Sequence, residues 1–145
     1  MRIERRQDRE PITLAPGRDV EVIQPVLHLL PTSWLFDHAT GTLFTSDSFG
    51  HLRLGPSESE PAADERVARQ DDATNEDMTE HLFTKYEWLR RLQDPEYIAT
   101  GVARVFETYD VKTIAPTHGR VIQGVDQVQK HKDWLISAIL QCPTE

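Results

Sequence analysis

Two side chains of the types that bind metals each follow a short apolar stretch. Asp47 comes shortly after 43–45, whose aliphatic, aromatic and β-branched residues favour a β-strand, and His118 follows the apolar stretch 111–115. A carboxylate at the end of a buried strand is costly to leave unpaired, so it meets a metal, a cation or several N–H donors. Imidazole binds zinc and iron alike, so His118 does not indicate which metal. The pattern predicts one site shared by the two strand ends. Two plainer interpretations stay open: an Asp47 that caps its loop, and a His118 that is buried with a hydrogen-bond partner.

Both stretches resemble motifs of one protein family. The segments 43–50 (LFTSDSFG) and 114–119 (IAPTHG) are similar to two late motifs of the metallo-β-lactamase fold, in the variant of flavodiiron proteins and related oxygen-binding di-iron domains. The resemblance extends from roughly residue 17 to residue 140. It implies the C-terminal half of an αββα sandwich, so that 1–145 is a single partial domain. It also implies that Asp47 bridges two irons and that His118 is a terminal ligand. Bridging suits a carboxylate, whose two oxygens can bind metals about 3.5–4 Å apart.

The same resemblance implies a conditional third ligand, His28. The family places a ligand histidine two residues before a proline, whereas here His28 lies three residues before Pro31. Neighbouring side chains of a strand point to opposite faces, so this shift turns His28 away from the site unless a bulge restores its direction. The expected metal ligands are therefore Asp47, His118 and, given such a bulge, His28, with Asp47 in the catalytic role.

The other histidines carry weaker signals. His38 falls in the expected hairpin turn, and His81 and His131 fall on polar faces of expected helices, so we expect these three at the surface. His51 follows Gly50 closely enough to reach the surroundings of the site.

One part of the resembled family's site is missing from this sequence. No His-x-His/Glu-x-Asp run is present, although this run normally supplies about half of both metal shells. We therefore expect a homodimer, or a complementary chain carrying the first half of the fold, to complete the site. The resemblance implies a di-iron oxidoreductase that binds and reduces O2 or NO. A zinc hydrolase of the same fold and a non-catalytic remnant or interaction module are the alternatives. No FMN-binding domain is expected in this chain.

Composition limits the classes of protein that fit. A chain of 145 residues, 38% of them hydrophobic, is expected to form one compact domain. The net charge of −8 argues against nucleic acid or an anionic membrane as partner. The acidic excess suits a salt-rich cytoplasm and a halophilic source, although an ordinary acidic protein explains it equally well. The single cysteine, Cys142, cannot form an internal disulfide, and no apolar run approaches the ~18–20 residues that span a bilayer. Both observations agree with a cytoplasmic protein.

An α/β order of elements is predicted to position these residues. The predicted elements are strands at 12–15, 20–23, 34–36 and 43–45, helices from 77 and from 95, a strand at 111–115 and a C-terminal helix from 125. The acidic segment 57–80 is predicted to be a flexible insertion. Without the first half of the fold, one face of the sheet would be bare. We therefore expect an exposed apolar patch made of Val22, Leu27, Leu43 and Phe44.

Overall fold

The structure, a computed structural model, describes residues 7–27, 32–52 and 73–141. His28, residues 57–72 of the acidic segment and Cys142 lie outside these ranges, so the ligand role of His28 stays a prediction. In the described part of the chain, no helix is long and apolar enough to cross a membrane.

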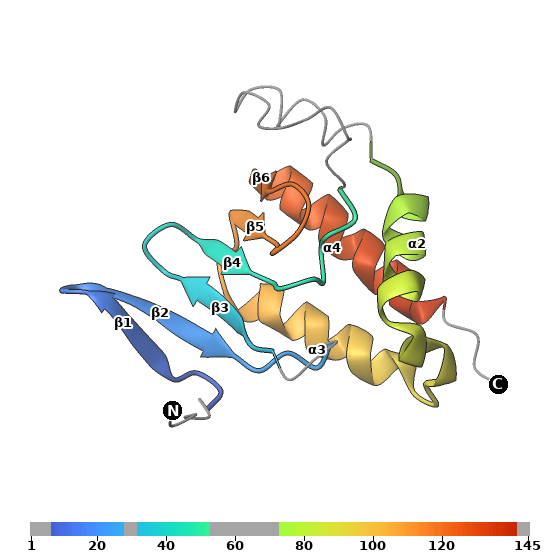
Figure 1. The fold of residues 1–145 in the computed structure, drawn as a ribbon, viewed down its shortest axis with the longest axis horizontal. Coiled ribbons are helices and arrows are strands. Elements are labelled where there is room, and N and C mark those ends of the chain that lie inside the picture. The colour runs from blue at the N-terminus through green and yellow to red at the C-terminus, as the bar shows by residue number, and fades with distance from the viewer. Residues whose placement is uncertain (1–6, 28–31, 53–72, 142–145) are drawn as a thin grey trace.

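The described strands form one mixed sheet whose spatial order follows the order in the chain (Figure 1). Its strands are β1 (Pro11–Ala15), β2 (Arg18–Ile23), β3 (Trp34–Asp37), β4 (Thr42–Phe44), β5 (Thr113–Ala115) and β6 (Ile122–Gln123). Neighbouring strands are antiparallel except β4 and β5, which are parallel. A parallel pair needs a long crossover connection, and the helical part of the chain supplies it. The predicted α/β class is confirmed.

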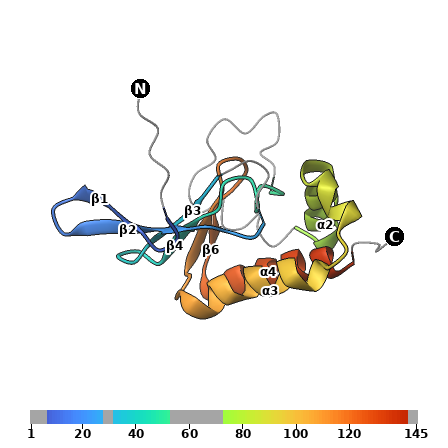
Figure 2. The same cartoon turned by 90° about the horizontal axis from the view of Figure 1, so that it is seen from below.

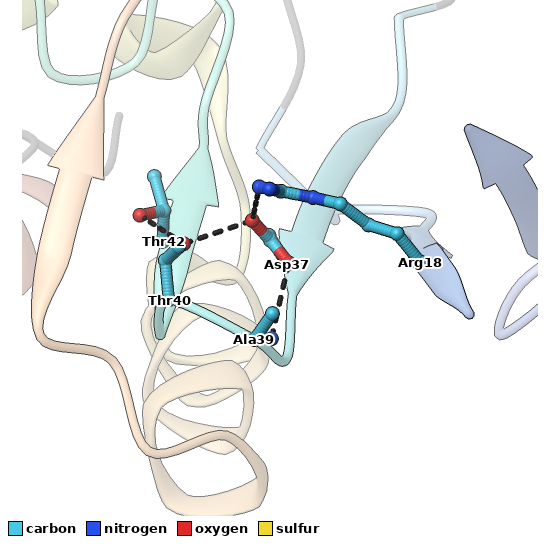
Figure 3. A network of polar contacts seen from close by, with 5 residues as sticks. All are labelled: Arg18, Asp37, Ala39, Thr40 and Thr42. Atoms are coloured by element: carbon cyan, nitrogen blue, oxygen red, sulfur yellow. Dashed lines mark hydrogen bonds and ion pairs between the residues drawn. The ribbon is translucent and has the colours of Figure 1, made fainter. Parts of the chain in front are cut away.

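A buried carboxylate holds the turn between β3 and β4 (Figure 3). Asp37 accepts hydrogen bonds from the Thr40 hydroxyl at 2.9 Å and from the Ala39 N–H at 3.0 Å, and Arg18 of β2 donates to it at 2.5 Å. Burial of the Asp37 carboxyl raises its pKa, but these hydrogen bonds and the Arg18 charge outweigh burial, so the pKa is lowered. The Thr40 and Thr42 hydroxyls are also in contact, at 2.8 Å. The network fixes the hairpin that places β4 in the middle of the sheet.

The helices are α2 (Asn75–Lys85), the 3-10 helix η1 (Glu87–Arg91), α3 (Pro95–Thr108) and α4 (Val125–Leu140). Helices α3 and α4 lie along one side of the sheet, whereas α2 lies beyond the ends of the strands (Figure 2). Helix α3 begins at the predicted residue 95, with Pro95 in its first turn and Asp94 as N-cap, whose side chain accepts a hydrogen bond from the Tyr97 N–H. Helix α4 contacts α2, α3, β5 and β6, and so joins the helical layer to the sheet.

Aromatic contacts mark the core between the sheet and the helices. Phe36 of β3 packs against Tyr109, the residue after α3, with ring centroids 4.8 Å apart. Phe49, beyond β4, packs against Phe106 of α3 at 6.1 Å and against Trp34 of β3 at 6.3 Å. The segment after β4 is therefore tied to α3 as well as to the sheet.

The expected apolar patch on the open face of the sheet is largely wrong. Val22, Leu27 and Leu43 are at most 1% exposed, whereas Phe44 is 42% exposed. Leu43 and Phe44 are neighbours on one strand and point to opposite faces, so only one of them can face away from the helical layer. The apolar surface that remains exposed is therefore smaller and lies around Phe44.

The elements differ from those predicted mainly around β5, β6 and α2. The strand expected at 111–115 begins at Thr113. The two-residue strand β6 was not predicted, because a strand this short carries no periodicity. The end of the expected acidic insertion, 75–80, belongs to α2, where a capping box between Thr74 and Asp77 starts the helix.

Candidate functional site

The parallel pairing of β4 and β5 brings the two predicted ligands to the same place. In this register Thr42 is paired with Thr113, Leu43 with Ile114 and Phe44 with Ala115. The pairing continues past the strand ends through hydrogen bonds from the Thr45 N–H to the Ala115 carbonyl at 3.2 Å and from the Thr117 N–H to the Ser46 carbonyl at 2.8 Å. The next residue on each side is Asp47 and His118. Their side chains lie 3.8 Å apart, from Asp47 Oδ1 to His118 Nε2.

This separation suits a shared ion better than a direct hydrogen bond. The distance of 3.8 Å is too long for an N–H···O bond. Two donors that are each about 2.0–2.2 Å from one ion lie roughly 3–4 Å apart. The His118 side chain is 81% exposed and that of Asp47 27%, so both are open to a ligand from outside.

The described residues do not form a complete metal site by themselves. Among residues 7–27, 32–52 and 73–141, no group of three or more His, Cys, Asp or Glu side chains could hold a metal. A di-iron centre needs more ligands than Asp47 and His118 provide. The pair alone therefore does not fit a di-iron group, and further ligands have to come from outside the described part of the chain.

The loop that carries Asp47 is tightly constrained. Ser46 has a positive φ of 51°, an unusual conformation for a residue with a side chain, and one that persists only when the surroundings enforce it. The Asp47 carbonyl accepts hydrogen bonds from the Gly50 N–H at 3.3 Å and from His81 Nε2 at 2.8 Å. The Ser48 hydroxyl is hydrogen-bonded to the Tyr86 hydroxyl at 3.0 Å, at the end of α2. The loop is thus fixed by α2 as well as by β5.

Three histidines are buried behind this loop, and the prediction of surface positions is wrong for two of them. His81 and His131 are 4% and 0% exposed, and His51 is 6% exposed. His131 lies between the buried Val128 and Leu135 on α4, at spacings of three and four residues. Reading this histidine as part of the apolar stripe would have placed it inside. His38 is at the surface, as predicted, and pairs with Glu21 at 2.8 Å.

Two of the buried histidines are in contact and are held in the neutral form. His51 Nε2 and His131 Nδ1 are 2.9 Å apart. Burial lowers the pKa of His51 to about 3, with the charges of His131 and His81 adding to the effect. Burial also lowers the pKa of His131 to about 4, with the Lys130 charge adding to it. At neutral pH the pair shares one hydrogen bond without carrying charge.

Comparison with known proteins finds similar structures, whereas no protein-family model and no curated protein matches the chain. A flavo di-iron protein mutant from Thermotoga maritima is 21% identical with a TM-score of 0.61, over 92% of this chain and 30% of that one. The rubredoxin oxygen:oxidoreductase from the anaerobe Desulfovibrio gigas is 20% identical with a TM-score of 0.62, over 94% of this chain and 32% of that one. A structure described as the peroxy diiron species of the chemotaxis sensor ODP is 20% identical with a TM-score of 0.52, over 88% of this chain and 48% of that one.

These similarities concern the fold. The chain spans about 30% of the length of the flavo di-iron protein and 32% of that of the oxidoreductase. The resemblance inferred from the motifs around Asp47 and His118 is confirmed at the level of architecture. The chain thus has the α/β fold of the flavodiiron proteins over the part of their length that it spans.

Proposed function

We propose that this chain supplies two ligands, Asp47 and His118, to an iron centre of the flavodiiron type, in an oxidoreductase that binds and reduces O2 or NO. The single observation that carries the proposal is the approach of these two side chains at the ends of the parallel strands β4 and β5, 3.8 Å apart. The similar structures, named as flavo di-iron proteins and an oxygen:oxidoreductase, support the choice of metal and reaction.

In this proposal each residue has a distinct task. The Asp47 carboxylate, held at the end of a constrained loop, offers two oxygens and can bridge two ions. The His118 imidazole offers Nε2, the ring nitrogen that faces Asp47. A metal bound here would supply the redox chemistry. The chain itself fixes the separation of the two ligands through the β4–β5 ladder.

Metal binding by the purified chain tests the proposal. We expect at most one Fe2+ or Co2+ per chain, bound weakly, because the described residues offer two ligands. Asp47→Asn and His118→Gln should each weaken binding at least as much as the about 10–100-fold that loss of an outer-shell partner causes. Equilibrium dialysis with metal analysis measures stoichiometry and affinity.

His38→Gln is the matched control, because His38 is an exposed histidine on the hairpin turn that already pairs with Glu21. It should leave the affinity unchanged. Two tightly held metals per chain, or full affinity in both ligand variants, would contradict the proposal. Thioester or lactam hydrolysis by a zinc-loaded form, without oxygen consumption by the iron form, would replace it with the hydrolase. If no metal binds even when a chain carrying the first half of the fold is present, the remaining alternative is a non-catalytic interaction module.

The proposal also requires a partner that brings the remaining ligands, either a second copy or a chain carrying the first half of the fold. The exposed side chain of Phe44 favours the uncovered face of the sheet as the surface that binds this partner. Phe44 is 42% exposed and pairs with Leu35 and Ala115 on the neighbouring strands. Burying a phenylalanine side chain is worth about 1.5–3 kcal/mol.

We therefore expect association at micromolar concentration, and Phe44→Ser should weaken it about tenfold or more. Sedimentation equilibrium of the chain alone, and mixed with a first-half chain, measures this. Tyr97→Ser is the control, because Tyr97 is 64% exposed but lies on α3, away from the sheet. A wild-type chain that remains a monodisperse monomer in both experiments would rule out this contact.

A further inference from the structure

We infer that His81 is a positioning residue that sets the separation of Asp47 and His118. The inference rests on the proposed ligand role of that pair and adds a residue on a different element, α2. His81 is 4% exposed, and its Nε2 lies 2.8 Å from the backbone carbonyl of Asp47. Because a carbonyl only accepts, Nε2 carries the proton and donates.

His81 acts on the backbone of Asp47 and not on its carboxylate. The carbonyl of Asp47 accepts both the His81 donor and the Gly50 N–H. The residue before it, Ser46, has φ 51°, so this stretch of backbone would relax if one of its supports were removed. His81 therefore leaves the carboxylate of Asp47 free for a ligand and fixes the direction in which it points.

The same imidazole also lies close to the strand end that carries His118. A Cβ atom built on Gly50 would lie 3.1 Å from the His118 carbonyl oxygen and 3.2 Å from His81 Cε1. The His81 ring, the Asp47 loop and the backbone of His118 thus meet at Gly50. The Thr117 N–H, one residue before His118, is hydrogen-bonded to the Ser46 carbonyl at 2.8 Å. A displacement of the loop at Asp47 is therefore transmitted to His118.

The helix that presents His81 is firmly anchored. Met78 and Leu82, on the same side of α2, are fully buried, and α2 packs against α4. The His51 ring lies 6.3 Å from the His81 ring and links to His131 on α4. The donor on His81 is consequently held in place by the helical layer and does not depend on the loop that it positions.

Three variants separate positioning from a merely structural role. His81→Leu fills most of the buried volume but removes the donor. His81→Gln keeps an N–H near the position of Nε2. Thr79→Val is the matched control, because it removes a hydroxyl donor of the same helix that binds the Asn75 carbonyl within α2 and not the Asp47 loop.

Amide hydrogen exchange of the metal-free chain gives the first readout. We expect His81→Leu to speed exchange of the Gly50 and Thr117 amides about tenfold relative to amides of α3, consistent with the loss of one hydrogen bond. His81→Gln should restore slow exchange to within about threefold, and Thr79→Val should show no selective effect. Uniform acceleration in all three variants, or unchanged exchange in His81→Leu, would overturn the inference.

Cobalt affinity gives the second readout and separates the inference from the proposed function. If wild type binds Co2+, His81→Leu should weaken binding at least about tenfold and His81→Gln should recover it, whereas equal affinities would overturn the inference. If wild type binds no metal, the proposed function fails. The exchange experiment still decides whether His81 positions the two strand ends.

Discussion

Acidification from pH 7 to pH 5 is expected to lower the free energy of unfolding by about 3–4 kcal/mol through the buried pair His51 and His131. In the folded protein the pKa of His51 is about 3 and that of His131 about 4, against 6.5 for an ordinary histidine. Below pH 6.5 the unfolded chain binds protons that the folded chain excludes. Stability is therefore complete above this pH and is lost at about 1.4 kcal/mol per pH unit for each histidine, until the folded pKa is reached.

The surroundings of the pair do not offset this effect. His51 faces His131 and His81, whose charges oppose its protonation, and the Asp77 carboxylate favours protonation more weakly. Lys130 opposes protonation of His131. No charged group of α2 or α4 described here therefore raises either pKa to its ordinary value.

Urea unfolding at pH 7, 6 and 5 measures the dependence. The double variant His51→Gln/His131→Gln should have a flatter dependence on pH, whatever its absolute stability, and His38→Gln should behave as wild type. This pH window lies above the range in which Asp37 and Asp77 titrate, because the pKa values of both carboxyl groups are lowered. Equal urea midpoints for wild type at pH 7 and pH 5 would show that the pair is protonated in the folded protein or is not buried.

Gly119→Ala is expected to destabilise the protein by about 3 kcal/mol or more and to disturb the candidate site. Gly119 has φ +93°, which costs a residue with a side chain roughly 1–2 kcal/mol. In addition, its Cβ would lie 2.8 Å from the Leu52 carbonyl oxygen and 3.3 Å from that of Gly50. These are backbone atoms, so relief requires moving the His118 strand end away from the Asp47 loop.

Gly124→Ala is the matched control. Gly124 has φ +97°, nearly the same backbone angle, but a Cβ there would meet no atom of the described residues within 4 Å. Thermal unfolding of both variants should show a clearly larger loss for Gly119→Ala, with the difference reporting the crowding alone. Equal losses would mean that the two strand ends can separate without cost.

Most of the architecture and the location of the site could be predicted from the sequence, because the signals are local. Asp94 and Pro95 specify the start of α3, and the apolar strands followed by Asp47 and His118 specify where the candidate site lies. The parallel register that places these two residues side by side is not local. It depends on how helices between the two strands pack, which no short pattern encodes.

The burial of His81 and His131 behind the candidate site was not predicted, for a related reason. His81 and His131 are polar residue types, and residue type favoured the surface, although both share a helix face with apolar side chains. Their burial depends on the packing of α2 against α4 and on partners far away in sequence, namely the Asp47 carbonyl and His51. Tertiary contacts overrode residue-type preference at both positions.

The parallel ladder between β4 and β5 also fixes when the site can form. Asp47 is synthesised well before His118, and the strand that brings His118 beside it can pair only after α2 and α3 have been made. Contacts so far apart in sequence carry a large loop-closure cost and form slowly compared with hairpins such as β3–β4. The hairpin and the helices can form from local contacts, whereas the pairing of β4 with β5, which brings Asp47 next to His118, joins segments that are far apart in sequence. Assembly of the site is therefore a late event in folding, and any ion that it binds would stabilise the end of the process and not its beginning.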